Sequence, residues 1–446
     1  MSNVDTSITL GGVKMRNPIG IGSVASPLVN RQYMTPELEA DLLLKQVEVG
    51  AGYICTSADC YVPEEWIPDL LKKSEPYNFV EAAQPWKFLK METRGQGIDG
   101  MYYTIGISYP LVRRAGTFKS RTEKVIELLK KKRPANVPII ANCAGMGAVV
   151  ETFVSTAKAE EAAGVDLIEI NIGCGIPSGI SGAPDYYFKK NYPLALSGVL
   201  AGDHPDIVEE ITRAVVQAVK IPVGVKLSPE TGFPRIIEMA QGIKRAGGKF
   251  INCGNNGVSI SPPDIYNGGK SKWPFLVDNF FTAGSGSWLR PIVYKQVASI
   301  SKFVPGIDVI CTGGLVHPEH IIEAMMLGAK ATQFVTGMMY EGRSLIKRDV
   351  KFLEQYMVQQ GYKKPDDFIG LGTKYIKPVN EVDFKPGKIF ARIDATKCNG
   401  CGRCVSHLCM ATHIEDGVSS VDPGKCIGCG MCVALCPQNA ASLYEK

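Results

Sequence analysis

The sequence predicts an α/β fold, a (β/α)8 TIM barrel, followed by a small cysteine-rich domain. Short β-rich runs alternate with amphipathic helical patterns from residue 17 to about 345, and the last fifty residues contain eight cysteines in two runs. Eight β-then-α units over roughly 330 residues are typical of a closed barrel of parallel strands. The chain of 446 residues is long enough for one large and one small domain.

The barrel strands are expected where apolar, β-branched residues cluster. They are predicted at 17–22, 53–56, 138–143, 167–172, 222–227, 250–253, 309–312 and 333–336. Helices are predicted where apolar residues recur at i, i+3, i+4 and i+7, as they do in 36–50, 120–133, 206–220 and 318–329. Pro36 and Pro318 occupy the expected first helical positions. An open doubly wound sheet is the alternative, but the nearest GxGxxG-like turn, 20–25, has no helix directly after it.

The segments between these elements predict where the barrel is covered and where it is open. A hairpin around Gly11 and Gly12 could form the floor of the barrel. The two longest connections, 57–119 and 254–289, both follow strands and therefore belong to the C-terminal face, where barrel enzymes build their sites. We expect three regions: the barrel at 1–345, a helix and linker at 346–388, and the cysteine-rich domain at 389–446.

The cysteine spacing is the most specific pattern in the chain. Each run has three cysteines separated by two residues and a fourth further on, and the runs are Cys398, Cys401, Cys404, Cys409 and Cys426, Cys429, Cys432, Cys436. Three close thiolates bind three irons of a [4Fe–4S] cluster, and the fourth ligand usually comes from the opposite run. We therefore expect Cys436 to complete the first cluster and Cys409 the second. Zinc and disulfides are the two alternatives. Zinc sites use paired cysteines without a third at this spacing.

Composition and charge limit the partners. The chain is 45% apolar, with a net charge of +5 and no long basic block, which does not favour nucleic acid. The N-terminus does not resemble a signal peptide, and no apolar stretch is long enough for a membrane span. Clusters and scattered thiols favour a reducing cytoplasm, as in an anaerobe.

Glycines end the last two predicted strands. Gly313 and Gly314 follow Thr312, and Thr336 precedes Gly337. Glycine-bearing turns at these two strand ends are the usual phosphate site of a barrel. The phosphate of flavin mononucleotide (FMN) fits, because electrons from clusters need a two-electron converter. Lys226, which closes an apolar strand, should point into the site rather than into the core.

Polar residues at other strand ends are candidates for substrate recognition. Asn171 closes one strand, and Asn255 and Asn256 follow another, although Asn before Gly also simply forms turns. Cys174 opens a Gly/Pro/Ser-rich loop and is a candidate proton donor. The cysteines at other strand ends are expected to be small buried hydrophobes.

Together these residues resemble the dihydroorotate dehydrogenase family, and the layout resembles the barrel-plus-ferredoxin part of dihydropyrimidine dehydrogenase. The resemblance covers nearly the whole chain and depends on the order of six short motifs: Asn17-Pro18 with Gly22-Ser23, Asn171-x-x-Cys174, Lys226-Leu-Ser-Pro, Asn255, Ser285-Gly-Ser-x-x-Arg290-Pro291 and Thr312-Gly-Gly. It implies hydride transfer between FMN and a ring carbon beside a carbonyl, with Cys174 handling the proton. It also implies that FMN contacts Gly22, Ser23, Asn142, Lys226, Ser285, Gly286, Gly313, Gly314, Thr336 and Gly337.

The chain departs from the family pattern at several positions. The family's second strand typically ends Thr-Lys-Thr, whereas this one continues Cys55-Thr-Ser-Ala. Gly175 replaces the proline usual after the loop cysteine, and Met410 replaces the proline after Cys409, which follows a longer spacer. The family's pyrimidine enzymes carry Asn-x-Glu on the loop after strand two, where Thr104 and Gly106 stand here. Fold and cofactor are expected to survive these changes.

The sequence thus predicts an FMN and iron–sulfur oxidoreductase that acts on a C=C or CH–CH bond beside a carbonyl. An enone, a ring ketone or a thioester would suit the aromatic residues expected near the site, which are Trp66, Tyr102, Tyr103, Tyr186 and Tyr187. The alternatives are an NAD(P)-linked dihydropyrimidine dehydrogenase catalytic subunit and a non-catalytic electron-transfer subunit. No convincing nicotinamide site is present in the sequence, so we expect an oligomer that receives electrons from ferredoxin or from a separate NAD(P)/FAD flavoprotein subunit.

Overall fold

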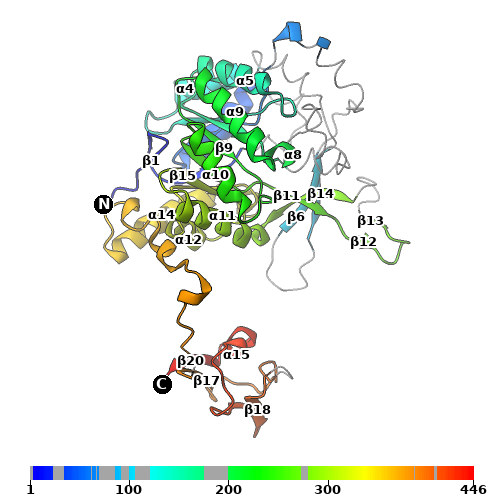
Figure 1. Ribbon diagram of the computed structural model, residues 1–446, viewed down its shortest axis with the longest axis vertical. Helices are drawn as coiled ribbons and strands as arrows, with labels where there is room; N and C mark the ends of the chain where they lie inside the picture. The colour runs from blue at the N-terminus through cyan, green and yellow to red at the C-terminus, as the bar shows by residue number, and fades with distance from the viewer. Residues whose placement is uncertain are drawn as a thin grey trace. The chain divides into compact units, whose positions relative to one another are not determined.

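The computed structural model divides into two compact units, Met1–Ile376 and Lys377–Lys446 (Figure 1). The residues that it describes are 4–23, 35–61, 63–66, 68–69, 86–91, 100–105, 121–174, 199–272, 280–385, 387–405 and 409–446. The predicted boundaries at 345 and 388 stay a prediction; helix α14 (Ser344–Gln360) and the short turn η8 (Leu371–Tyr375) both pack on α12 (Pro318–Met326) within the first unit.

Eight parallel strands form the predicted barrel sheet, in the spatial order β3-β16-β15-β10-β9-β8-β7-β4. The strands are β3 (Ile19–Ile21), β4 (Ile54–Cys55), β7 (Ile139–Cys143), β8 (Leu167–Asn171), β9 (Val223–Lys226), β10 (Phe250–Cys253), β15 (Asp308–Thr312) and β16 (Ala331–Phe334). The Gly52 N–H donates to the Ile19 carbonyl at 2.7 Å and brings the last strand back to the first. The barrel prediction is confirmed, and β16 starts two residues earlier than predicted.

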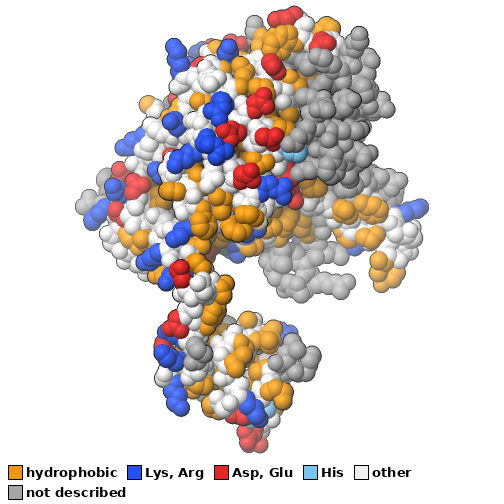
Figure 2. Space-filling model, in the orientation of Figure 1, with side chains coloured by type: hydrophobic (Ala, Val, Ile, Leu, Met, Phe, Trp, Pro, Cys, Tyr) orange, Lys and Arg blue, Asp and Glu red, His pale blue; other side chains and the backbone are white. Residues whose placement is uncertain are grey.

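Helices alternate with the strands and cover the outside of the sheet (Figure 1). They are α1 (Pro36–Glu48), α4 (Glu123–Lys132), α5 (Val150–Ala163), α8 (Val199–Gly202), α9 (Pro205–Ala218), α10 (Arg235–Arg245), α11 (Arg290–Phe303), α12, α13 (Thr336–Glu341) and α14. Pro36 and Pro318 do begin α1 and α12, where a missing N–H costs no helical hydrogen bond. Basic and acidic side chains are intermixed over these helices on the face seen in Figure 2.

The core has two parts because the strands have two faces. Apolar residues on the outer face of the strands pack against the helices in one large cluster. Inside the lower barrel, Tyr53 and Phe250 pack with Ile8, Leu10 and Met15. Those three residues come from the hairpin of β1 (Ile8–Leu10) and β2 (Val13–Met15), which is therefore the predicted floor.

The two long connections meet in a second sheet that the sequence did not predict. β5 (Trp86–Lys90) and β6 (Gly100–Ile105) come from the first connection, and β11 (Gly257–Ile260) and β14 (Phe281–Gly286) from the second. They form one antiparallel sheet in the order β11-β14-β6-β5, and Figure 1 shows β6, β11 and β14 side by side. A further hairpin, β12 (Pro263–Asp264) with β13 (Lys270–Ser271), extends from the second connection.

The C-terminal unit is built from two hairpin-like pairs. β17 (Ile389–Ile393) pairs with β20 (Ala441–Glu445), and β18 (Thr412–Glu415) pairs with β19 (Val418–Val421). One short helix, α15 (Met431–Leu435), follows Gly430.

Short 3-10 turns connect other parts of the chain. Before these strands they are η7 (Pro365–Asp367), η8 and η9 (Val379–Glu381), and η2 (Glu64–Trp66) lies in the first long connection. Among the described residues, no helix has the length and apolar character needed to cross a bilayer.

Candidate active site and cluster sites

A buried polar network lies inside the barrel near the C-terminal ends of its strands. The Glu169 carboxyl on β8 accepts from Asn142 Nδ2 on β7 at 2.8 Å and from Asn252 Nδ2 on β10 at 2.7 Å. Asn252 Oδ1 in turn accepts from the Thr312 hydroxyl on β15 at 2.5 Å. Each strand thus contributes one polar side chain that its neighbours satisfy, which makes burial of these groups tolerable.

Two donors in this network have no acceptor among the described residues. Gln333 on β16 accepts from Asn252 Nδ2 at 3.0 Å through Oε1, but its buried Nε2 makes no hydrogen bond there. Lys226 ends β9 with 4% of its surface exposed, and in the described part of the chain no hydrogen bond or ion pair involves its Nζ. Its strand neighbours in register are Asn171 and Asn252. The barrel end therefore offers unused N–H donors.

The predicted substrate amides lie together. Asn171 Nδ2 donates to Asn142 Oδ1 at 2.9 Å, and Asn255 Nδ2 donates to Asn171 Oδ1 at 3.4 Å. Asn255 Oδ1 accepts from the backbone N–H of Asn256 at 2.9 Å, so both carboxamide oxygens are occupied. Each of the two amides keeps one N–H, and the buried Nδ2 of Asn256 has no acceptor among the described residues. The cluster is therefore suited to bind a hydrogen-bond acceptor.

Several of the residues predicted to bind the phosphate contact neighbouring strand ends. The Thr336 hydroxyl donates to the Ser285 hydroxyl at 3.0 Å, which joins the end of β14 to the start of α13. Gly314 has φ +74°, and a Cβ there would lie 2.4 Å from the backbone N of Arg290, so the turn after β15 needs a glycine. Gly22 N donates to the Phe334 carbonyl at 3.3 Å and thereby lies next to β16.

The remaining predicted FMN residues flank these groups. Ser23 follows Gly22 at the end of β3, Gly286 closes β14, Gly313 follows β15, and Gly337 is the second residue of α13. All of them lie at C-terminal strand ends or on β14, whose residues pair with β6. The prediction that they form one site stays a prediction, but the fold brings their strand ends to the same face of the barrel.

Cys174 lies three residues beyond the end of β8 and is half-buried. Desolvation by burial raises the pKa of the four other strand-end thiols, Cys55, Cys143, Cys253 and Cys311, as expected for cysteines of the core. Thr104 lies on β6 opposite Lys87 of β5, and Trp66 ends η2. Gly106, Gly175, Tyr186, Tyr187, Lys189 and Lys190 lie outside the described residues.

Sequence reasoning missed the residues at the centre of the network. Glu169, Asn252 and Gln333 each occupy a strand and are fully buried. The signal was present, because a charged or amide residue inside runs such as LIEIN, FINC and ATQF needs a polar neighbour within the barrel. Ser57, in the stretch where the family pattern has a lysine, donates its hydroxyl to Glu39 of α1 at 2.8 Å.

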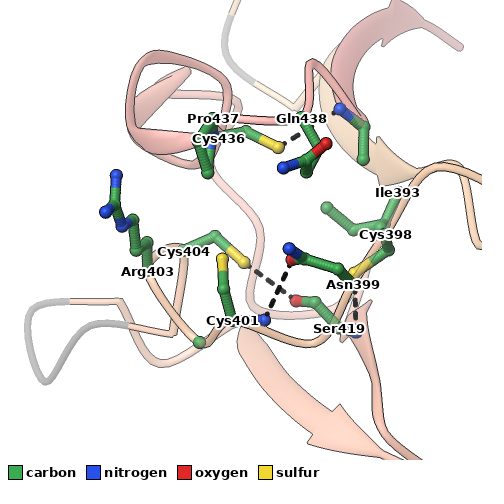
Figure 3. A pocket seen from close by; sticks show the side chains of 12 residues that line it. Ile393, Cys398, Asn399, Cys401, Arg403, Cys404, Ser419, Cys436, Pro437 and Gln438 are labelled. Atoms are coloured by element: carbon green, nitrogen blue, oxygen red, sulfur yellow. Dashed lines mark hydrogen bonds between the residues drawn. The ribbon is translucent and has the colours of Figure 1, made fainter.

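In the C-terminal unit, four cysteines surround one cavity (Figure 3). Cys398, Cys401 and Cys404 from the first run line it together with Cys436 from the second, which is the predicted first ligand set. Backbone N–H groups point at the thiols, from Ser419 to Cys398 Sγ at 3.4 Å and from Ala440 to Cys436 Sγ at 3.2 Å. Four thiols that converge from two runs fit a [4Fe–4S] cluster.

The second predicted set is arranged by a matching loop. Helix α15 contains Cys432 as its second residue and is preceded by Cys426 and Cys429. The Ala391 N–H donates to Cys426 Sγ at 3.3 Å. Hydrogen bonds from the Thr412 side chain and the Ala411 N–H lower the pKa of Cys409, which favours a thiolate ligand. That Cys409 completes this set stays a prediction.

The barrel residues also fit the flavin that this kind of site would hold. The unsatisfied Gln333 Nε2 and the ammonium group of Lys226 offer donors to an acceptor-rich ring, and the Gly313-Gly314 turn offers backbone N–H groups to a phosphate. Gln333 was not among the predicted FMN residues, and the assignment of Lys226, Gly313 and Gly314 to FMN stays a prediction.

A (β/α)8 barrel with a polar C-terminal end, joined to a ferredoxin-type unit, defines a class of flavin and iron–sulfur proteins. Residues 115–357 match the family "Dihydroorotate dehydrogenase", and residues 390–437 match the "4Fe-4S dicluster domain". The first match covers more than half of the chain, so this protein belongs to the dihydroorotate dehydrogenase family.

Three curated relatives illustrate this membership. The NAD-dependent dihydropyrimidine dehydrogenase subunit PreA of Escherichia coli K12 is 28% identical over 279 residues, which are 62% of this chain and 62% of the relative. The catalytic subunit of dihydroorotate dehydrogenase B (NAD(+)) of Thermoplasma volcanium is 27% identical over 83% of this chain and 99% of its own length. The corresponding subunit of Methanocella arvoryzae is 31% identical over 249 residues, which are 56% of this chain and 72% of the relative. The match thus spans less than two thirds of PreA.

Proposed function

We propose that this chain is an FMN- and iron–sulfur-dependent oxidoreductase that acts on a C=C or CH–CH bond next to a carbonyl. The observation that carries the proposal is the set of unused N–H donors on Asn171, Asn255, Gln333 and Lys226 at the C-terminal end of the barrel. FMN, when bound, would exchange single electrons with the clusters and a hydride with the substrate. The chain's own residues would bind and orient the substrate and would supply its proton.

The asparagine cluster would bind the substrate carbonyl. Because the oxygens of Asn171 and Asn255 already accept hydrogen bonds, the groups left for a ligand are N–H donors. A carbonyl oxygen accepts from such donors, and they would stabilise negative charge that develops on it during reduction of an adjacent C=C bond. The buried Nδ2 of Asn256 adds a third donor nearby.

Cys174 would hold and deliver the proton. It follows β8 two residues after Ile172, whose N–H donates to the Lys226 carbonyl at 3.4 Å. This backbone bond ties the start of the cysteine loop to the strand that carries Lys226. A thiol that delivers its proton to the carbon next to the carbonyl acts as a general acid.

The substrate proposed is an enone, a ring ketone or an acyl thioester rather than a pyrimidine. Thr104 and Gly106 stand where pyrimidine enzymes of the family place an Asn-x-Glu pair for the ring amides. Each buried ring N–H without a partner would cost about 1–3 kcal/mol of binding. The two lysines Lys189 and Lys190 could bind an anionic tail of such a substrate.

An anaerobic screen tests this proposal. The dithionite-reduced protein is mixed with cyclic enones, acyl thioesters, uracil, thymine and orotate, and flavin absorbance is followed. Rapid reoxidation by an enone or a thioester is expected. Reoxidation by uracil or thymine alone would overturn the substrate proposal, and reoxidation by none of these would favour an electron-transfer subunit.

The second candidate is the catalytic subunit of a dihydropyrimidine dehydrogenase. It is supported by the similarity to PreA of E. coli, an NAD-dependent dihydropyrimidine dehydrogenase subunit. In either case we propose that the chain works in an oligomer with ferredoxin or an NAD(P)/FAD flavoprotein subunit, in the cytoplasm of an anaerobe. Full activity of the isolated chain with NADH alone would refute the need for such a partner.

A further inference from the structure

The cysteine-rich unit is an internal duplication whose two halves can be compared residue by residue. In one half the Cys398 N–H donates to the Asp394 carbonyl at 3.0 Å, and in the other the Cys426 N–H donates to the Asp422 carbonyl at 3.1 Å. A lysine directly before each cysteine, Lys397 or Lys425, pairs with that aspartate at 3.3 Å in both halves. The first cysteine of each run is therefore held in the same way.

The equivalence extends to the strand behind each first cysteine. Ser419 of β19 donates its backbone N–H to Cys398 Sγ at 3.4 Å, and Ala391 of β17 donates its backbone N–H to Cys426 Sγ at 3.3 Å. Both residues are buried, at 4% and 8% exposure. Ser419 and Ala391 thus occupy corresponding positions beside the two predicted ligand sets.

Their side chains differ in the one respect that matters to a cluster. The Ser419 hydroxyl lies 3.0 Å from Cys404 Sγ, the third cysteine of the first set, and Figure 3 shows the two groups joined across the cavity wall. Once Cys404 is a ligand thiolate, it can only accept, so the hydroxyl becomes the donor. Ala391, at the corresponding position of the second set, has a methyl group and no hydroxyl to donate.

The other hydroxyl of this region compensates only in part. The Thr412 side chain hydrogen-bonds Cys409, but its hydroxyl also donates to the Cys404 carbonyl at 2.7 Å, so its single proton is shared between the two acceptors. The fourth cysteines have comparable backbone donors, from Ala440 to Cys436 and from Ala411 to Cys409. The Ser419 hydroxyl is therefore the clearest imbalance between the two sets in the described residues.

We propose that Ser419 gives the cluster bound by Cys398, Cys401, Cys404 and Cys436 a higher reduction potential than its duplicate. Hydrogen bonds to cluster sulfurs help to set that potential, because they stabilise the more electron-rich reduced state. The step is the transfer of one electron from the second cluster to the first, in which no bond forms or breaks and no proton moves. The first cluster takes the first electron and holds it; Ser419 is a positioning residue that touches neither flavin nor substrate.

This inference depends on the proposed two-cluster function, and a potentiometric titration of the whole protein followed by electron paramagnetic resonance tests it. The wild-type protein should show two one-electron transitions. Ser419→Ala should lower the reduction potential of the upper transition by about 59 mV, which corresponds to a tenfold change in how one electron is shared between the two clusters. Ser419→Thr, which keeps a hydroxyl, should leave the potential near that of the wild type.

The reciprocal variant provides an independent test that does not depend on the folding of Ser419→Ala. Ala391→Ser should raise the lower transition toward the upper one, while Thr412→Val, which removes a shared hydroxyl, should change the lower transition by less than Ser419→Ala changes the upper one. Iron content is measured on the same samples. Fewer than about eight irons per wild-type chain would contradict the two-cluster function, whereas about eight irons with potentials unchanged by Ser419→Ala and Ala391→Ser would contradict the role of Ser419.

Discussion

The two compact units of the chain bury very different interiors. Met1–Ile376 encloses a large apolar cluster between strands and helices and a second one inside the barrel floor. In Lys377–Lys446 the buried cluster consists of Ala391, Cys404, Cys432 and Ala441, so half of it is predicted ligand sulfur. A unit this small rarely folds on apolar burial alone. The comparison indicates that the barrel can hold its shape by packing, and it predicts that the smaller unit depends on bound metal.

Removal of iron should unfold the smaller unit and leave the barrel folded, which is the largest effect expected. Chelation under reducing conditions should abolish amide protection throughout 389–446, because the thiols lose the clusters that join the two runs. The barrel strands, such as β7 and β8, should keep their protection. Hydrogen exchange with mass spectrometry measures both regions in one sample. A cysteine-rich unit that stays protected without iron would show that the apolar contacts suffice.

Cys174→Ala should reduce turnover at least about a hundredfold, the usual contribution of a positioned acid. Flavin and iron contents should stay unchanged, because Cys174 belongs to neither cofactor set proposed here. Cys253→Ala is the matched control, since Cys253 is a fully buried thiol that ends β10. Turnover is measured with whichever substrate reoxidises the reduced protein. Unchanged turnover in Cys174→Ala would assign the proton to Tyr186, Tyr187 or solvent.

Glu169→Gln should destabilise the barrel without touching its apolar core. The new amide would present a donor to Asn142 or Asn252, each of which already donates to Glu169. An unpaired buried donor costs about 1–3 kcal/mol, and the urea midpoint of barrel unfolding should fall accordingly. Glu127→Gln, at an exposed position on α4 that pairs with Lys131, is the control and should leave the midpoint where it is. Equal midpoints for both variants would mean that the network adds no stability.

His320 should give the barrel a modest dependence on acid. Burial, with the nearby Arg290 and His317, lowers its pKa from 6.5 to about 4; Arg348 acts in the same direction and Glu319 against it. The unfolded chain takes up a proton near pH 6.5 and the folded one only near 4, so stability is lost as the pH falls through that window. Urea midpoints between pH 7 and 4 measure this loss. It should shrink in His320→Gln, and an equal loss in both proteins would remove His320 as its cause.

The strand pattern predicted the barrel well because each parallel strand reads as a short apolar run followed by an amphipathic helix. The same reasoning could not predict the antiparallel sheet of β5, β6, β11 and β14. Its strands come from two connections about 150 residues apart, and their pairing depends on contacts between those connections rather than on local pattern.

The candidate site was predicted only in part for a similar reason. Asn171 and Asn255 stand at strand ends, where a polar residue is conspicuous, and the structure brings them together. Glu169 and Gln333 stand inside apolar runs, and their partners come from other strands. The cysteine spacing predicted that Cys436 lies beside Cys398, because two runs of this kind usually exchange their fourth ligands, and the structure places both around one cavity.

Cofactor content of the anaerobically purified protein tests most directly whether a flavin barrel and a two-cluster unit share this chain. About eight irons and one FMN per chain are expected. Cys426→Ser should lower the iron content while FMN stays bound, since the barrel keeps its shape by packing. Zinc in place of iron, or FAD instead of FMN released on denaturation, would contradict the account.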